Sequence, residues 1–296
     1  MSKKILTRPE EIERSITTEF RYTIWSKFIA GIKKYQLIKP GDKVCVCISG
    51  GKDSNLMAEC FKLLSRHSDF PFEVRYLVMD PGYNPINLQK IKSNLAEMDI
   101  PAKIVKTDIF EIANSQDHSP CYLCAKMRRG ALYRLAQEMG CNKIALGHHY
   151  DDVIETILMN LLHAGSFQTM LPKLHSDHFQ GMEVIRPLYL VREEDIKAWR
   201  DRNKLQFIQC ACRFTENCAV CDNGGGGSAR YDTKMLIRKL KETNPQVEKN
   251  IFKSAENVVL NKVVGYKDSK GHHTFLDDYD RQSINSQEAS SSSKNS

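Results

Sequence analysis

The chain has 296 residues, 41% of them hydrophobic and 27% charged, which is typical of a soluble globular protein with one large domain or two ordinary ones. No apolar run reaches the length of a membrane span, and the N-terminus MSKKILTRPEE lacks the apolar stretch of a signal peptide, so we expect a cytoplasmic protein without a membrane partner. The net charge of +7 is uneven, because basic residues dominate residues 1–40 and 118–137. Such basic surfaces are either solvated faces or binding sites for phosphate-rich partners.

Apolar residues at helical spacing predict one long helix over residues 10–36, which ends before Pro40-Gly41-Asp42. Beyond it, short apolar runs alternate with helical patterns, which indicates an α/β fold with a doubly wound parallel sheet covered by helices on both faces. The predicted strands are residues 43–49, 72–79, 102–105, 143–146, 184–185 and 206–208. The predicted helices are residues 53–66, 86–98, 122–139, 151–162, 193–202, 234–240 and 248–260.

The sequence Ser49-Gly50-Gly51-Lys52-Asp53-Ser54 stands where the first predicted strand gives way to a helix. Its two glycines allow backbone N–H groups to approach an anion, the helix N-terminus adds positive potential, and Lys52 adds a full charge. It is not a Walker A loop, because position 46 is not glycine and Asp53 replaces the required Ser or Thr. We therefore predict a phosphate site that is not built for γ-phosphate cleavage of the P-loop type.

Ten cysteines in a chain without an export signal indicate metal or redox chemistry rather than a disulfide framework. Cys121 and Cys124 form a Cys-x-x-Cys pair at the start of a predicted helix, where Lys126, Arg128 and Arg129 favour the thiolate form. Four more cysteines that could share a metal with this pair lie downstream, namely Cys210, Cys212, Cys218 and Cys221.

The spacing of these cysteines leaves several arrangements open. The pair could join one downstream cysteine in a 4Fe–4S cluster with one open iron, or join Cys218 and Cys221 in a closed zinc site. The four downstream cysteines could instead form a zinc knuckle of their own, and the pair could be two inert buried thiols.

Gly147, His148 and His149 follow the fourth predicted strand, and Asp151 and Asp152 begin the next helix. Ligands of doubly wound sheets bind at the carboxyl ends of the strands, so we expect these residues to share one crevice with the phosphate-binding loop. Neighbouring carboxylates suit a hydrated Mg²⁺ beside a triphosphate, whereas the rival interpretation is that both acids cap the helix. The two histidines either contact phosphate or position the base, or one of them has only a supporting role.

The loop SGGKDS resembles the pyrophosphate loop of the PP-loop (N-type) ATPase superfamily. The stretch from Cys121 to Gly165, with the sequences CYLCAKMRRG and LGHHYDD, looks like the corresponding part of the tRNA 2-thiocytidine synthetases. The similarity covers about residues 10–260 and resumes at Pro172-Lys173-Leu174, Ile185-Arg186-Pro187-Leu188, Arg192-Glu193 and Asp195-Ile196.

This resemblance implies a tRNA sulfurtransferase that transfers AMP from ATP to the C2 oxygen of a pyrimidine, releases pyrophosphate and replaces the oxygen with sulfur. Cytidine is the expected target base. The implied cofactors are ATP, Mg²⁺ and a 4Fe–4S cluster. The implied partners are tRNA, a sulfur donor such as a cysteine desulfurase, and a second copy of the chain in a homodimer. The basic N-terminal helix and Arg128 and Arg129 would dock the RNA backbone, and the target base must leave its stack to reach the pocket.

The resemblance also implies residue roles. In this family the Cys-x-x-Cys pair and a distant third cysteine hold the cluster, which here gives Cys121, Cys124 and Cys210. Cys212 lies one residue closer to Cys210 than the family's usual second cysteine, so the third ligand is Cys210 or Cys212. The implied nucleotide-binding residues are Ser49, Gly50, Gly51, Lys52, Asp53, Ser54, Asp80, Gly147 and His148, and the implied catalytic residues are Lys52, Asp53, Cys121 and Cys124.

Asp80 closes the second predicted strand and would contact the ribose or adenine in this interpretation, although a turn with Pro81 and Gly82 explains it equally well. We expect four parts in the chain: an N-terminal helical region (1–40), a PP-loop ATPase domain (41–210), a Cys-rich loop with C-terminal helices (211–263) and a largely disordered tail (264–296).

Three alternative functions remain open at this point. A PP-loop enzyme could thiolate uridine instead of cytidine. A lysidine-type synthetase would adenylate the same oxygen but needs no metal, so the paired cysteines count against it. A zinc-dependent RNA-binding module would use the cysteines and the basic face, but it has no use for SGGKDS.

Overall fold

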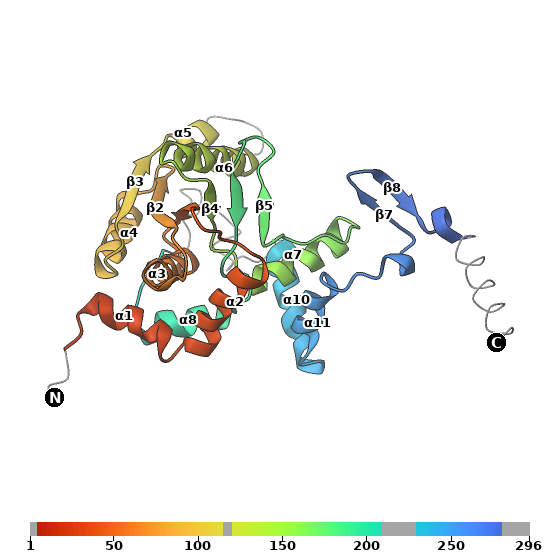
Figure 1. The fold of residues 1–296 in the computed structure, drawn as a ribbon, viewed down its shortest axis with the longest axis horizontal. Helices are drawn as coiled ribbons and strands as arrows, with labels where there is room; N and C mark the ends of the chain where they lie inside the picture. The colour runs from red at the N-terminus through yellow and green to blue at the C-terminus, as the bar shows by residue number, and fades with distance from the viewer. Residues whose placement is uncertain (1–4, 115–119, 209–228, 280–296) are drawn as a thin grey trace. The chain divides into compact units, whose positions relative to one another are not determined.

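The computed structural model describes residues 5–114, 120–208 and 229–279 (Figure 1). The chain divides into two compact units, Met1–Glu248 and Lys249–Ser296. The first unit contains the sheet, the phosphate-binding loop and all the helices that surround them. The candidate site therefore belongs to the first unit.

A six-stranded sheet with the order β3-β2-β1-β4-β6-β5 organises the first unit. Five strands pair in parallel, and β5 pairs with β6 in the antiparallel direction at one edge. The predicted doubly wound parallel sheet is confirmed, with β5 as an addition that the sequence pattern did not indicate. The strands are β1 (Lys43–Cys47), β2 (Glu73–Asp80), β3 (Ala102–Lys106), β4 (Lys143–Ala145), β5 (Lys173–His175) and β6 (Glu183–Ile185).

The direction in which the chain adds strands reverses between β1 and β4. Because parallel crossovers are right-handed, this reversal places α3 and α6 on opposite faces of the sheet (Figure 1). The gap between the carboxyl ends of β1 and β4 is the place where doubly wound folds bind ligands. The main helices of this unit are α3 (Lys52–His67), α4 (Pro85–Glu97), α5 (Ile109–Asn114), α6 (Pro120–Glu138), α7 (Tyr150–His163), α8 (Glu193–Arg202) and α10 (Ala229–Thr243).

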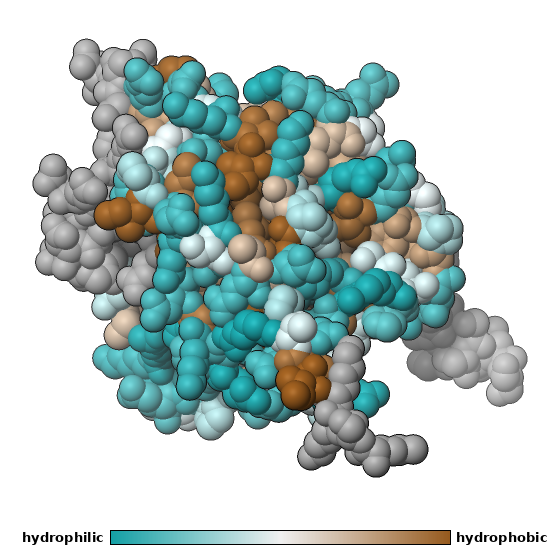
Figure 2. Space-filling model, turned by 90° about the vertical axis from the view of Figure 1, so that its left-hand side faces the viewer, coloured by the Kyte–Doolittle hydropathy of each residue, from teal (hydrophilic) through white to brown (hydrophobic). Residues whose placement is uncertain are grey.

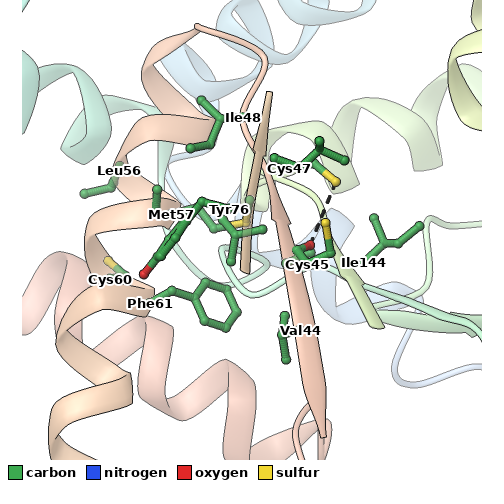
Figure 3. Close-up of a cluster of buried hydrophobic side chains, with 14 of the residues drawn as sticks. Val44, Cys45, Cys47, Ile48, Leu56, Met57, Cys60, Phe61, Tyr76 and Ile144 are labelled. Carbon is green, nitrogen blue, oxygen red and sulfur yellow. Dashed lines mark hydrogen bonds between the residues drawn. The ribbon is translucent and has the colours of Figure 1, made fainter. Parts of the chain in front are cut away.

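The core between the sheet and α3 fixes the start of that helix. Val44 and Ile48 of the first strand and its exit pack with Leu56, Met57 and Phe61 of α3 (Figure 3). Four consecutive residues of β1, from Val44 to Cys47, are buried, as expected for a strand covered on both faces. The short link between β1 and α3 therefore has little freedom to move.

The predicted helix over residues 10–36 is wrong in one respect, because the structure interrupts it. Helix α1 (Arg8–Thr17) ends where the backbone of Thr18 leaves the helical region, and a π-helical segment (Arg21–Trp25) leads into α2 (Ser26–Lys34). Apolar residues at helical spacing are still buried on both sides of the break, among them Ile16 and Phe28. Because the buried residues recur at helical spacing through the break, spacing alone did not reveal it.

Two other predicted elements differ from the structure. Residues 206–208 form no strand; their apolar side chains pack on the core instead of pairing with the sheet. The last predicted helix is shorter, since α11 spans only Val247–Ser254.

Within the second unit, the strands β7 (Gly265–Asp268) and β8 (Gly271–Thr274) form an exposed hairpin in the region predicted to be a largely disordered tail. The sequence did not predict this hairpin, because its glycines and charged residues do not form the apolar pattern of a strand. Residues 280–296 lie outside the described part.

Hydrophilic side chains cover most of the face shown in Figure 2, and apolar side chains interrupt them in smaller patches. None of the helices in the described part of the chain is both long and apolar enough to cross a membrane.

A buried carboxyl group in α3 gives a first testable consequence. Glu59 is 0% exposed, and its ion-pair partner within the described residues is Lys62, whose Nζ lies 3.3 Å from Glu59 Oε1. Burial raises the pKa of Glu59 to about 7, and Lys62 offsets only part of this effect. Since the pKa is raised in the folded state, the protonated carboxyl stabilises the fold fully below pH 4.5, and this contribution is lost as the pH rises through about 7.

The wild type should lose stability as the pH rises from 5 to 8, whereas Glu59→Gln should not, because glutamine stays neutral. The free energy of unfolding of Glu59→Gln relative to that of the wild type should therefore increase by about 2 kcal/mol from pH 5 to pH 8. Urea unfolding of both proteins at the two pH values measures this difference. Glu138→Gln, at an exposed position of α6, is the matched control. Identical pH dependence in wild type and Glu59→Gln would contradict the assignment.

Candidate functional site

The link between β1 and α3 is a compact loop that internal hydrogen bonds hold in place; we call Ser49–Ser54 the phosphate loop. The Ser54 hydroxyl donates to the Gly51 carbonyl at 3.1 Å and accepts from the Ser49 backbone N–H at 3.1 Å. The Asn55 side chain adds a bond to the Gly51 carbonyl at 2.8 Å. The loop is thus preorganised at the N-terminus of α3, where free N–H groups and the helix dipole favour an anion.

Two glycines are required by the packing around this loop. Gly50 has a φ of +86°, and a Cβ there would lie 2.7 Å from side-chain atoms of Ile91 and Ile208. A Cβ on Gly147, in the loop after β4, would lie 3.0 Å from the Ser54 backbone nitrogen. The loop after β4 therefore packs directly on the first turn of α3, as the shared crevice requires.

We expect Gly50→Ala to destabilise the nucleotide-free protein by at least about 2 kcal/mol, because alanine must adopt a left-handed conformation and displace two isoleucine side chains. Gly51→Ala is the matched control, since φ is −81° there and a Cβ would lie 3.7 Å from its nearest neighbour, Ser49 Oγ. Gly51→Ala should lower the free energy of unfolding by less than about 1 kcal/mol. Urea unfolding of the three proteins measures both changes, and equal losses in the two variants would contradict this account.

A cavity of about 390 Å³ opens beside the phosphate loop. Its walls come from the ends of β1, β2 and β4 and from the first turns of α3 and α7, so it occupies the gap at which the strand order reverses. Apolar and polar side chains both line it, which is the usual composition of a small-ligand site. The lining residues are Cys47, Ile48, Ser49, Asp53, Ser54, Met79, Tyr83, Arg128, Leu132, Leu146, Gly147, His148 and Asp152.

Helix α6, which carries the cysteine pair near its start, also reaches this cavity. Arg128 and Leu132 line the cavity, and Cys124 lies one turn before Arg128 on the same side of the helix. Cys124 is buried, at 7% exposure. Position 121 is in the first turn of α6, and Cys210, Cys212, Cys218 and Cys221 lie outside the described residues.

The two histidines after β4 have different surroundings. His149 is the N-cap residue of α7, and its backbone N–H donates to Asp152 Oδ2 at 3.0 Å, while its ring lies 3.7 Å from Asp53. His148 lines the cavity, and burial lowers its pKa to about 4, so its imidazole is neutral at pH 7. Within the described part of the chain, His148 Nδ1 is buried without a hydrogen-bond partner. A buried polar atom of this kind points to a ligand or water in the cavity.

The PP-loop domain model matches residues 24–213, which include the phosphate loop and all of α6. The chain is 38% identical over 231 residues to a tRNA-cytidine(32) 2-sulfurtransferase from Geotalea uraniireducens, a match that covers 77% of this chain and 88% of that protein. A protein of the same name from Paraburkholderia phymatum is 32% identical over 269 residues, which cover 90% of this chain and 77% of that one.

The chain belongs to the PP-loop family of tRNA sulfurtransferases. The resemblance predicted from the sequence is thereby confirmed, and membership places the protein among the transferase enzymes. A solved structure, the U34-tRNA thiolase NcsA from Methanococcus maripaludis with its [4Fe-4S] cluster, has the same fold, with a TM-score of 0.60 at 21% identity over 78% of this chain and 76% of that one.

In this PP-loop protein the two predicted magnesium ligands have separate protein partners. Asp151 accepts from Arg192 Nη2 at 3.1 Å and from the backbone N–H of Glu193 at 2.7 Å. Asp152 accepts from the His149 N–H and from Arg230 Nη1 at 3.1 Å. Helix capping, the rival interpretation, is thus visible at Asp152. Of the two acids, only Asp152 lines the cavity.

Asp80 forms the turn that was its alternative assignment. Its Oδ1 accepts from the backbone N–H groups of Gly82, at 2.8 Å, and Tyr83, at 2.7 Å. That turn places the Tyr83 hydroxyl 3.3 Å from the Ser49 carbonyl, to which it donates. Sequence reasoning missed Tyr83 as a cavity residue, although its position just after the second strand was a usable signal.

Glu193 is a second residue that sequence reasoning did not place in the site. Lys52 Nζ lies 3.1 Å from Asp53 and 3.3 Å from Glu193 Oε1. Burial opposes a charged Lys52, but these two carboxylates raise its pKa above the ordinary value. The PP-loop lysine is therefore a cation held between Glu193 and Asp53, and Asp53 lines the cavity. Glu193 was visible in the sequence only as part of a family motif.

Proposed function

We propose that this protein is an ATP-dependent tRNA thiolase that makes 2-thiocytidine. One observation carries the proposal: the phosphate loop and the helix of the cysteine pair line the same cavity. A nucleotide and a sulfur-carrying centre must be close together if one base is to be activated and thiolated in a single pocket. The name that the relatives share, tRNA-cytidine(32) 2-sulfurtransferase, favours cytidine as the base and position 32 as its place.

In the proposed reaction the C2 oxygen of the base attacks the α-phosphorus of ATP, and pyrophosphate leaves. The oxygen on C2 then carries AMP and has become a good leaving group. Sulfide attacks C2, the C2–O bond breaks, and AMP leaves with the original oxygen. Oxygen is exchanged for sulfur at one carbon, so the substitution needs no net electron transfer.

The phosphate loop would hold the β- and γ-phosphates with its backbone N–H groups, and Lys52 would neutralise part of their charge. The adenosine part would occupy the cavity, with Met79 and Leu146 against the base. Arg128 reaches the same cavity from α6 and is placed to stabilise negative charge at the α-phosphate or on the leaving pyrophosphate.

The donor chemistry fits a 4Fe–4S cluster as far as the described chain extends. Cys124 contributes a buried thiol one turn before the cavity residue Arg128, and Cys121 precedes it by three residues in the first turn of α6. The described residues hold no group of three Cys, His, Asp or Glu side chains that could bind a metal ion. The proposed third ligand, Cys210, follows Ile208, whose backbone N–H donates to the Gly50 carbonyl at 3.3 Å. The described chain thus reaches the phosphate loop just before the segment that carries Cys210. When bound, such a cluster would supply one iron with an open position for sulfide.

Magnesium remains part of the proposal with Asp152 as its first candidate ligand, because Asp152 lines the cavity. Asp151 would have to leave Arg192 and the Glu193 backbone to join it. A sulfur donor such as a cysteine desulfurase, a homodimer and a cytoplasmic location are further parts of the proposal that stay predictions.

Anaerobically purified protein with unmodified tRNA, ATP, Mg²⁺ and sulfide tests the function directly. We expect a visible absorption band, release of pyrophosphate that depends on tRNA, and 2-thiocytidine in the digested tRNA. Mass spectrometry of the nucleosides distinguishes this product from 2-thiouridine. A colourless zinc protein, or pyrophosphate release without any thiolated base, would contradict the proposal.

A further inference from the structure

The carboxylate of Glu193 connects the phosphate-loop lysine to helix α10. Its Oε1 lies 3.3 Å from Lys52 Nζ, and its Oε2 accepts from Lys234 Nζ at 2.6 Å. Lys197, one turn further along α8, approaches the same Oε2 at 3.0 Å. The side chains of Lys52 and Glu193 are only 19% and 15% exposed, so water screens this part of the network weakly.

Glu193 is held in place from several sides. It begins α8, and its backbone N–H donates to Asp151 Oδ2 at 2.7 Å, which ties it to α7. Lys234 belongs to α10, which packs on α7. One turn before Lys234, Arg230 of α10 forms ion pairs with Asp152, at 3.1 Å, and Glu155, at 3.0 Å. The position of Glu193 therefore depends little on the state of Lys52.

A triphosphate on the phosphate loop would compete with Glu193 for Lys52. If Lys52 turns to the phosphates, Glu193 loses one of its cations but remains half-buried near the incoming negative charge. Two cations then remain to neutralise it, and of these Lys234 makes the shorter contact and is the more buried, with 30% of its side chain exposed against 39% for Lys197. The free-energy cost of leaving Glu193 without Lys52 therefore depends largely on Lys234 of α10.

We infer that Lys52 and Lys234 share Glu193 while the nucleotide site is empty, and that ATP draws Lys52 away and leaves Glu193 to Lys234, so that ATP binding and the docking of α10 on α7 and α8 strengthen each other. Lys234 is a positioning residue in this scheme, since it acts on ATP through Glu193. The coupling is reciprocal by thermodynamic linkage. The inference rests on the proposed function only in its assumption that ATP binds at the phosphate loop.

Four variants test the scheme through the Kd for ATP, measured by calorimetry. Lys234→Met should weaken ATP binding about tenfold, because Glu193 then keeps Lys52 and repels the phosphates. Glu193→Gln should tighten binding a few-fold, because it removes the competing carboxylate. In the double variant, Lys234→Met should change the Kd by less than about twofold relative to Glu193→Gln alone. Lys239→Met is the matched control, since it removes the same charge from an exposed position of α10 and should leave the Kd unchanged.

Hydrogen exchange of α10 gives a second readout. ATP should slow exchange in α10 of the wild type but not of Glu193→Gln. A Kd for Lys234→Met equal to that of the wild type would overturn the inference. It would also be overturned if Lys234→Met weakened ATP binding as much in the Glu193→Gln protein as in the wild type. If the wild type itself binds no ATP, the proposed function fails instead, so the two failures can be told apart.

Discussion

Replacing Lys52 with alanine should reduce pyrophosphate release by at least about 100-fold, the largest effect we expect from a single side chain of the phosphate loop. Lys52 is the cation that Asp53 and Glu193 hold at the start of α3. Its charge becomes most valuable as pyrophosphate leaves, when negative charge on the β-phosphate grows. Alanine removes that charge and leaves the loop backbone intact.

Pyrophosphate release in the presence of saturating tRNA, together with unfolding curves, measures the effect of Lys52→Ala. Lys92→Ala, at an exposed position of α4, serves as the control for loss of a lysine. The control should release pyrophosphate at the wild-type rate. A wild-type rate in a folded Lys52→Ala protein would refute the role of the phosphate loop in adenylation.

The second large effect concerns the cysteine pair. We expect Cys124→Ala and Cys121→Ala to lower thiolation by at least about 100-fold, because each removes a proposed cluster ligand, while the Kd for ATP stays within about twofold of the wild type. The nucleotide part of the cavity comes from other residues, chiefly the phosphate loop and the ends of the strands. Sulfur transfer and nucleotide binding should therefore separate in these variants.

Iron content, thiolated nucleosides and the Kd for ATP are the measurements for these variants. Cys141→Ala is the matched control, since Cys141 is also buried but lies outside the Cys-x-x-Cys pair. Unfolding curves show whether the loss of the buried Cys124 side chain affects the fold. Thiolation that persists in either Cys121→Ala or Cys124→Ala would contradict the cluster assignment.

Several features of the site were predictable because they depend on neighbours in the sequence. An apolar strand followed by Gly50 and Gly51 at a helix start produces a tight anion-binding turn with little help from the rest of the chain. The position of Gly147 and His148 after the fourth strand followed from the rule that parallel strands end at one edge. The break between α1 and α2 could not be predicted in this way, because apolar residues at helical spacing are buried on both sides of it.

Other features depend on contacts between distant residues. The sequence offered two roles each for Asp80, Asp151 and Asp152, and only the fold revealed the turn that Asp80 forms, the bond from the Glu193 backbone to Asp151 and the cap at Asp152, while their ligand roles stay predictions. Residues 206–208 have the composition of a strand, yet Ile208 meets the phosphate loop instead of the sheet. Local pattern does not determine whether an apolar segment pairs or packs, because both outcomes bury the same side chains.

The amino-acid sequence by itself determined the α/β class, the phosphate loop, the cysteine pair and the family. Each of these is encoded in short stretches, where covalent geometry and helix or strand periodicity leave few choices. Only the tertiary structure decided that Glu193 faces Lys52, that Lys234 of α10 shares its carboxylate, and that Arg128 of α6 lines the cavity beside the phosphate loop. Charges far apart along the chain are paired by the packing of helices, and no local pattern records which helices will meet.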